Sequence, residues 1–256
     1  MSVQPANPES IAALRASVGG ILASAGEHDV LPFGLELLDG KLAAGGLSMG
    51  GLHEVTGSST SLADDAAATL FLAGIAARFA MDADAPAFWA TTRFDLYAPG
   101  LEQVGLAPAN IIFAEARNDD QLLAVVEDAV RDGSAAAIIG EVRRVSMTAT
   151  RRLQLVAGEA GVPVLLFRRW RKAGVEPFAD SSAAATRWRI GCASSSPLCV
   201  AGVGRPRWAV ELVRQRGGEP FSLILEGCDE TGRLAVPAPT RHRAAAAHGA
   251  AHSLAA

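Results

Sequence analysis

The chain has little cysteine, and it lacks the long apolar segments that membrane or secreted proteins carry. Its three cysteines, Cys192, Cys199 and Cys228, form no CxxC pair. We therefore expect neither a disulfide framework nor a structural zinc site, and free thiols suit a reducing compartment. No charge-free run of about 18 apolar residues appears, and no basic stretch precedes an apolar one near residue 1. These absences predict a cytoplasmic protein without a membrane partner.

Lysine is also scarce, since 21 of the 23 basic residues are arginine. Residues 1–141 hold 6 basic and 19 acidic residues (−13), residues 142–216 hold 14 and 4 (+10), and residues 217–256 hold 3 and 4 (−1), which sum to −4. A basic segment behind an acidic one predicts contact with a polyanion or an acidic partner. The alternative is a folded domain that carries charges at both ends.

Strand-like and helical segments alternate through the first two thirds of the chain. Strands are predicted at 52–56, 86–91, 110–113, 135–139 and 162–167, with helices at 66–80, 119–130 and 148–160 between them. After residue 183, the segments 185–191, 207–214 and 221–225 alternate with period two and have no helix between them. The pattern predicts an α/β fold: a mostly parallel sheet with flanking helices and an antiparallel C-terminal extension.

The length of the chain fits one domain with a segment at each end. We predict an N-terminal helix region at 1–30, with its helix at 8–25 and Ile11, Leu14, Val18 and Leu22 on that helix. The core domain is expected at 31–236. The segment 237–256 is rich in Ala, His and Arg, and we expect it to be disordered.

The junction between the strand at 52–56 and the next helix has the frame of a phosphate-binding loop without its functional residues. After Gly57 come Ser58, Ser59, Thr60, Ser61, Leu62, Ala63 and Asp64. In a GxxxxGK[ST] loop the second glycine would fall at Leu62, the lysine at Ala63 and the magnesium-binding hydroxyl at Asp64. We therefore predict a degenerate loop and no cofactor. An unusual loop that binds ATP through backbone N–H groups alone is the alternative.

The order of segments resembles the RecA-type ATPase core over roughly residues 30–226, with its most specific match at 45–57. More narrowly, the segments 47–55 and 207–218 resemble the ImuA family, RecA-like accessory proteins of bacterial DNA-damage mutagenesis cassettes. The resemblance implies action in translesion synthesis beside a Y-family-like polymerase homologue and an error-prone replicative-type polymerase.

The resemblance also implies where catalytic residues should stand. Glu141 falls at the position of the Walker B acid, whereas Thr92 stands where a water-activating Glu is expected. Threonine is no general base at neutral pH, and Glu141 would hold Mg²⁺ poorly without the loop hydroxyl. We therefore predict no enzyme activity, no catalytic residue and no metal site, with Glu141 as a relic.

A basic segment follows the strand at 162–167, at the position of a DNA-binding loop in RecA. It consists of Arg168, Arg169, Trp170, Arg171 and Lys172. Arginine with tryptophan suits phosphate contact and base stacking on single-stranded DNA. The same residue types are enriched at protein–protein hot spots. A solvated loop with one packed tryptophan is the third interpretation.

Two other functions compete with the accessory role. One is an active RecA-type DNA-dependent ATPase, and the other is a cell-division inhibitor of the SulA type. Residues 8–25 would serve a homo-oligomer or dock on a partner, and the sequence does not choose between these uses.

Overall fold

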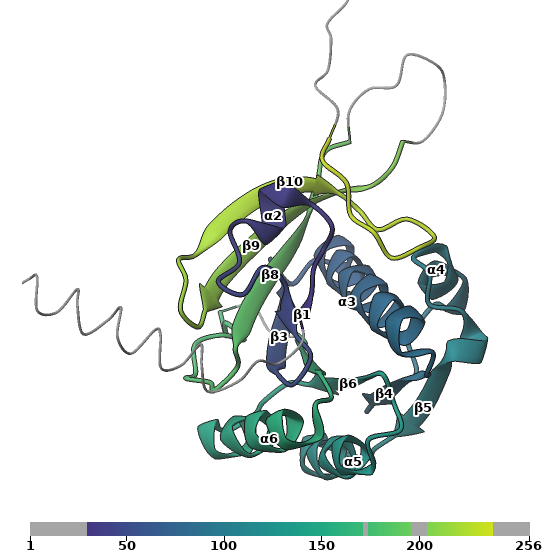
Figure 1. The fold of residues 1–256 in the computed structure, drawn as a ribbon, viewed down its shortest axis with the longest axis vertical. Helices are drawn as coiled ribbons and strands as arrows, with labels where there is room; N and C mark the ends of the chain where they lie inside the picture. The colour runs from purple at the N-terminus through teal and green to yellow at the C-terminus, as the bar shows by residue number, and fades with distance from the viewer. Residues whose placement is uncertain (1–29, 171–173, 196–203, 238–256) are drawn as a thin grey trace, which may run out of the picture.

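The computed structural model describes residues 30–170, 174–195 and 204–237. An eight-stranded sheet in the order β10-β9-β8-β3-β7-β6-β4-β5 organises this part of the chain (Figure 1). Its strands are β3 (Leu52–Gly57), β4 (Ala87–Thr91), β5 (Ile111–Glu115), β6 (Ala137–Val142), β7 (Val164–Arg168), β8 (Thr186–Ala193), β9 (Arg207–Gln215) and β10 (Phe221–Glu226). The short strands β1 (Val30–Leu31) and β2 (Leu47–Ser48) form a separate antiparallel pair.

The sheet is mostly parallel, as the alternating pattern predicts. Strands β5, β4, β6, β7, β3 and β8 run in one direction, and β9 pairs antiparallel with both β8 and β10. One detail differs from the expectation of three added antiparallel strands, because β8 pairs parallel with β3 and belongs to the parallel part. After β7 the chain therefore returns to the edge of the sheet where the parallel strands begin, before it enters β8 beside β3.

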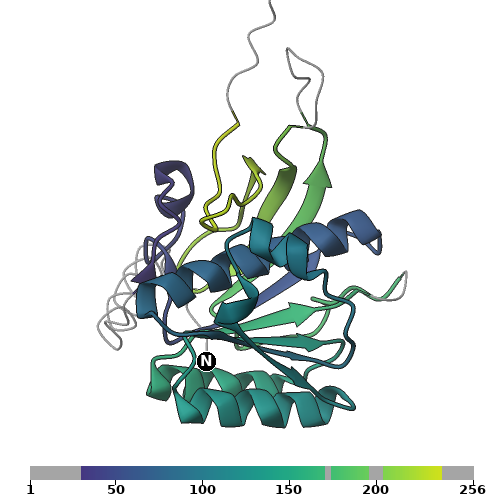
Figure 2. The same ribbon diagram turned by 90° about the vertical axis from the view of Figure 1, so that its right-hand side faces the viewer.

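Helices cover both faces of the sheet. Helix α3 (Leu62–Ala83) lies on one face, and α5 (Asp119–Asp132) and α6 (Met147–Ala160) lie side by side on the other (Figure 2). The shorter elements are α2 (Glu36–Asp39), α4 (Ala98–Gln103) and η1 (Pro108–Asn110). The result is a three-layer arrangement with β3 near the middle of the central layer.

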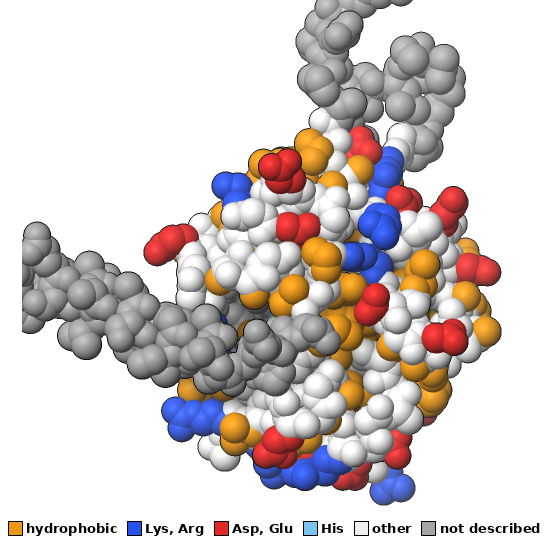
Figure 3. Space-filling model, in the orientation of Figure 1, with side chains coloured by type: hydrophobic (Ala, Val, Ile, Leu, Met, Phe, Trp, Pro, Cys, Tyr) orange, Lys and Arg blue, Asp and Glu red, His pale blue; other side chains and the backbone are white. Residues whose placement is uncertain are grey.

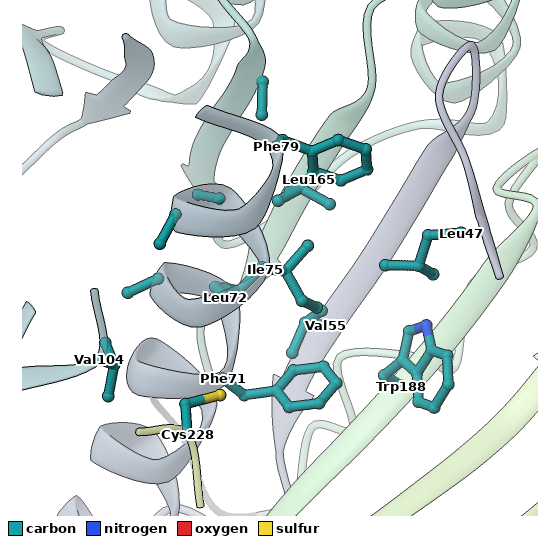
Figure 4. Close-up of a cluster of buried hydrophobic side chains, with 14 of the residues drawn as sticks. Leu47, Val55, Phe71, Leu72, Ile75, Phe79, Val104, Leu165, Trp188 and Cys228 are labelled. Atoms are coloured by element: carbon teal, nitrogen blue, oxygen red, sulfur yellow. The ribbon is translucent and has the colours of Figure 1, made fainter. Parts of the chain in front are cut away.

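Helix α3 is apolar almost all round because it forms the centre of the larger core. Phe71, Leu72 and Ile75 face Val55 of β3 and Trp188 of β8 (Figure 4). Among the described residues α3 is long and apolar enough to cross a membrane, with mean hydropathy 1.4, but 67% of that window is buried inside the protein. A helix buried between a sheet and its loops shows this composition for packing reasons.

Helices α5 and α6 are amphipathic and bury one face each. Leu122, Val126 and Val130 of α5 are buried with Leu153 of α6 in the second core cluster. The sequence pattern predicts Asp119 and Asp120 as the cap of α5, but both lie in its first turn. The side chain of Asn118 is the cap and accepts a hydrogen bond from Gln121 N. Both helices end at a left-handed glycine, as helix C-termini commonly do.

Several predictions fall wholly or partly outside the described residues. The helix at 8–25, most of the segment 237–256, Cys199, Arg171 and Lys172 are not described. Of the other cysteines, Cys228 is buried against α3 and Cys192 is exposed in β8. Burial raises the pKa of the Cys228 thiol to about 12, which keeps that thiol protonated.

Candidate functional site

The junction between β3 and α3 is shorter than the sequence suggests. Strand β3 ends at Gly57, four residues follow, and α3 begins at Leu62 rather than near residue 66. Ser61 caps the helix, since its hydroxyl accepts a hydrogen bond from the backbone N–H of Asp64 at 3.1 Å. Leu62, Ala63 and Asp64 therefore form the first turn of α3, where a phosphate-binding loop would present its lysine and hydroxyl.

The carboxylate of Asp64 is bound by the groups that surround the loop. Ser59 Oγ donates a hydrogen bond to Asp64 Oδ2 at 2.5 Å, and the backbone N–H of Cys192 donates to Oδ1 at 2.8 Å. The side chain joins the start of α3 to strand β8. An anion at a helix N-terminus is stabilised by the helix dipole, and here the protein's own Asp64 provides the negative charge.

Three backbone donors in and beside the loop are also engaged within the protein. Ser58 N–H donates to the carbonyl of Ile190 at 2.8 Å, and Ser61 N–H donates to Ser59 Oγ at 3.1 Å. Asp65 N–H donates to the carbonyl of Ser61 at 3.1 Å. These N–H groups point at protein acceptors, so they are not arranged to surround a phosphate.

Arg169 lies beside the loop and joins three structural elements. Its guanidinium contacts Glu141 Oε2 of β6 at 2.8 Å, Asp95 Oδ1 after β4 at 3.2 Å, and the carboxylate of Asp65 in the first turn of α3. The side chain of Arg169 is only 7% exposed. We call these four residues the Arg169 cluster. One guanidinium holds three carboxylates from separate elements.

Burial governs the protonation equilibria of the Arg169 cluster. It raises the pKa of Glu141 and of Asp65, while the charge of Arg169 acts to lower both. Burial acts to lower the pKa of Arg169, but Glu141 and then Asp65 and Asp95 raise it above its usual value. Arg169 therefore stays charged. The cluster depends on it to keep buried carboxylates ionised.

Glu141 occupies the position that the sequence assigned to a relic acid, and both of its oxygens are used. Trp89 Nε1 donates to Oε1 at 2.7 Å, and Arg169 Nε donates to Oε2 at 3.0 Å. Thr92, after β4, is half-buried. Within the described ranges no group of three or more His, Cys, Asp or Glu residues is placed to hold a metal ion. A divalent cation at Glu141 would have to displace a guanidinium.

Arg168 belongs to a second buried ion cluster on the other face of the sheet end. Glu54 of β3 is fully buried and accepts from Arg168 Nη1 at 2.9 Å and from Arg187 Nε at 2.7 Å. The place of Glu54 at the end of the sheet, next to His53, predicts a hydrogen bond to the loop after β3. This is wrong, because Glu54 pairs with Arg168 of β7 and Arg187 of β8 instead. The guanidinium of Arg187 also packs over the Phe178 ring, 4.4 Å from its centroid.

Two of the five residues predicted to contact DNA or a partner are buried. Arg168 and Arg169 are 2% and 8% exposed, and their guanidiniums hold the sheet end together. Trp170 is half-buried and lines a pocket with Thr60, Leu62 and Arg93. A DNA or partner contact at residues 170–172 stays a prediction.

His53 stands mid-strand among apolar residues, which predicts a core histidine rather than a ligand. The structure confirms this: His53 is buried, with Nδ1 2.8 Å from Thr186 Oγ1 and Nε2 3.0 Å from the Ser48 carbonyl. The period-two alternation of the later strands predicts that Trp188 and Trp208 point into the core, and both do. The same alternation predicts that Arg187 points outward into solvent, which is wrong, because the face opposite Trp188 is covered as well and Arg187 is buried.

The fold and this site define the chain as an α/β protein whose strand–loop–helix junction is filled by its own charged side chains. No family model matches the chain. It is similar to Protein ImuA from two strains of Caulobacter vibrioides, each 38% identical over 202 residues, which cover 77% of this chain and 83% of the relative. The chain therefore belongs to the ImuA family, a family associated with translesion mutagenesis.

Proposed function

We propose that this chain is a RecA-like, cytoplasmic accessory protein of damage-induced, error-prone translesion synthesis that neither binds nor hydrolyses ATP. The observation that carries the proposal is the position of Asp64, whose carboxylate is bound inside the loop by Ser59 and Cys192 N–H. The central place of β3 in a mostly parallel sheet supports the RecA-like part.

Electrostatics argues against a nucleotide at this junction. Four carboxylates (Asp64, Asp65, Asp95, Glu141) and two guanidiniums (Arg93, Arg169) surround the loop, a formal balance of −2. Two unit charges about 4 Å apart interact by ~4 kcal/mol at an effective dielectric near 20. A polyphosphate would meet net repulsion here and find no lysine at position 63 to offset it.

Without turnover, the protein would act through contacts with other proteins, and the sheet edge at β5 is suited to one. Ile112 and Phe113 of β5 are 47% and 39% exposed, and Phe94 and Tyr97 beside α4 are 62% and 73% exposed. The Phe94 and Phe113 rings lie 5.9 Å apart. Because neighbouring side chains of a strand point to opposite faces, Ile112 flanks the open edge on the face opposite Phe113. We call these four residues around the open edge the β5 patch. An open edge strand with exposed aromatic side chains is a common site for strand addition by a partner.

The β5 patch is offered as the contact for the Y-family-like polymerase homologue that the family resemblance implies. Co-purification of the tagged full chain with that homologue tests it. Ile112→Glu should weaken binding at least tenfold, while Ile224→Glu, on the opposite edge strand β10 and 49% exposed, should not. Equal binding by both variants, or no co-purification of the unmodified chain, contradicts the proposal. Self-association lost in Ile112→Glu would assign the patch to a second copy.

Single-stranded DNA is a second candidate ligand. A cleft of about 410 Å³ lies at the carboxyl ends of β6 and β7. The exposed Arg143 and Arg144 line it beside the acids Asp119, Glu176 and Asp180, whereas Arg168 and Arg169 at its base are already paired with Glu54 and Glu141. Fluorescence anisotropy with a labelled oligonucleotide, repeated at two salt concentrations, tests this candidate. Binding that falls with salt and with Arg143→Ala/Arg144→Ala supports it, because phosphate contacts release counterions. Absence of binding at low salt removes it.

A further inference from the structure

A groove of about 900 Å³ lies between α6 and the end of β9, away from the loop and from the β5 patch. Met147, Arg151 and Leu155 of α6 line one side, and Arg214 and Arg216 line the other. Leu155 is 66% exposed. Basic side chains, mixed with acidic ones, lie along the lower rim of the face in Figure 3, where α6 and α5 run. We call the groove between α6 and the end of β9 the α6–β9 groove.

The groove carries a net positive charge, because three arginines and one acid, Glu159, line it. Arg214 and Arg216 donate to the backbone carbonyls of Ala184 and Ala183. Among the described residues, neither they nor Arg151 forms an ion pair. Burial lowers the pKa of Arg214, and the charge of Arg187 acts in the same direction while that of Glu54 acts against it. An occupant with acidic groups beside apolar ones would complement this surface.

The segment that leads into β2 contacts the groove. Gln215, which lines the groove, accepts a hydrogen bond from Ala43 N–H at 2.9 Å and donates to the Lys41 carbonyl at 2.9 Å. Strand β2 pairs with β1, where Val30 is the first described residue, so the preceding residues join the described chain at the strand pair next to this contact. Residues 25–30, fully extended, span at most about 17 Å, which limits how far from Val30 a docked segment can begin.

The sequence before Val30 contains apolar and acidic side chains that would complement the apolar and basic lining of the groove. Ile11, Leu14, Val18 and Leu22 recur at helical spacing, and Glu27 and Asp29 lie between them and the described chain. We propose that residues 8–29 of this chain dock in the α6–β9 groove, with the apolar residues against Leu155 and Met147 and the two acids toward Arg214 and Arg216. The inference goes beyond the proposed function, and it holds or fails independently of ATP binding.

Disulfide trapping on the full chain tests the docking and its direction. Leu14→Cys is combined with Leu155→Cys in a Cys192→Ser/Cys199→Ser background, where the buried Cys228 remains. The matched control places the second cysteine at Ala124, on the exposed face of α5. Under mild oxidation the Leu155 pair should form an intramolecular disulfide at least five times faster than the control pair. Disulfide-linked dimers would assign the groove to a second copy, and equal rates would remove the docking; both outcomes overturn the proposal.

Hydrogen exchange provides a second readout that does not depend on cysteine geometry. Amides of residues 8–25 should exchange at least tenfold faster in Arg214→Glu/Arg216→Glu than in the unmodified chain. Arg117→Glu/Arg131→Glu makes the same charge change at exposed positions outside the groove and should leave the rates unchanged. Rates that are equal in all three proteins contradict docking through these arginines.

Discussion

The guanidinium of Arg169 and the carboxylate of Glu141 lie 2.8 Å apart in the interior, at the carboxyl ends of the neighbouring strands β7 and β6. The acid that the RecA resemblance places at the Walker B position is therefore bound to an arginine of the same chain. The same guanidinium reaches Asp65 at the start of α3, so the ion pairs and the loop form one structural unit.

Removal of Arg169 should destabilise the fold strongly. Arg169→Ala leaves Glu141, Asp65 and Asp95 without their common cation, a change that costs ~3–5 kcal/mol in other buried ion pairs. Unpaired buried carboxylates have raised folded-state pKa values, so stability lost at pH 7 should partly return at pH 5, where they bind protons. Urea unfolding at both pH values measures this.

The control for this variant is Arg93→Ala. Arg93 pairs with Asp95 at 3.5 Å but is 53% exposed, so we expect a loss below ~1 kcal/mol. Equal losses in the two variants would mean that the Arg169 cluster does not stabilise the fold.

Loss of the Glu54 charge, on the other face of the sheet end, should destabilise the fold about as strongly as loss of Arg169. Glu54→Gln leaves Arg168 and Arg187 buried without a compensating charge, and we expect a loss of ~3–5 kcal/mol. The matched control is Glu176→Gln, whose partner Arg189 is partly exposed and whose own side chain is 48% exposed. A loss below about 1 kcal/mol in Glu54→Gln would contradict the assignment.

The stability of the fold should fall in mild acid because of His53. Burial lowers the pKa of His53 from 6.5 to about 4, although its hydrogen bond to the Ser48 carbonyl acts in the opposite direction. The unfolded state therefore binds the proton first, so this contribution is present above pH 6.5 and is lost as the pH falls toward 4. Up to about 3 kcal/mol is expected from such a shift.

Comparison with His53→Gln isolates this contribution. Asp65 and Glu141 titrate in both proteins and cancel in the difference. The variant should be less stable at pH 7 but should lose less stability between pH 7 and pH 4.5 than the unmodified chain. Parallel pH profiles of the two proteins would show that His53 does not titrate as its burial requires.

Placing the residues of a GxxxxGK[ST] loop after β3 should produce ATP binding but no ATP hydrolysis. Leu62→Gly/Ala63→Lys/Asp64→Thr removes one carboxylate and supplies the missing cation, so Mg²⁺-ATP affinity should rise at least tenfold over the unmodified chain. Hydrolysis should remain absent, because Glu141 stays paired with Arg169 and Thr92 is no general base. Leu62→Gly/Asp64→Thr, which retains Ala63, is the control and should gain less. ATP turnover by the triple variant would contradict this reasoning.

The order of strands and helices was predictable because it depends on local periodicity. The apolar run that becomes α3 reveals a buried helix. The alternation at Trp188 and Trp208 reveals the face of each strand that packs in the core. Element ends were less predictable, since Ser61 starts α3 through a cap that the sequence analysis placed inside a loop.

The two ion clusters could not be derived from the sequence. Glu54 meets Arg168 and Arg187 across 114 and 133 positions, and Arg169 meets Asp95 across 74. Arginines at strand ends are usually exposed, so a basic run was interpreted as a contact surface. A run of arginines facing an excess of acids earlier in the chain is the signal that points to internal pairing instead.

Isothermal titration of the purified full chain with Mg²⁺-ATP, with and without single-stranded DNA, decides whether the β3–α3 junction binds nucleotide. We expect no binding up to millimolar nucleotide in either condition, because Asp64 and the Arg169 cluster occupy the junction. Micromolar binding by the unmodified chain would show that the junction accepts a polyphosphate and would restore the interpretation of the chain as a motor protein.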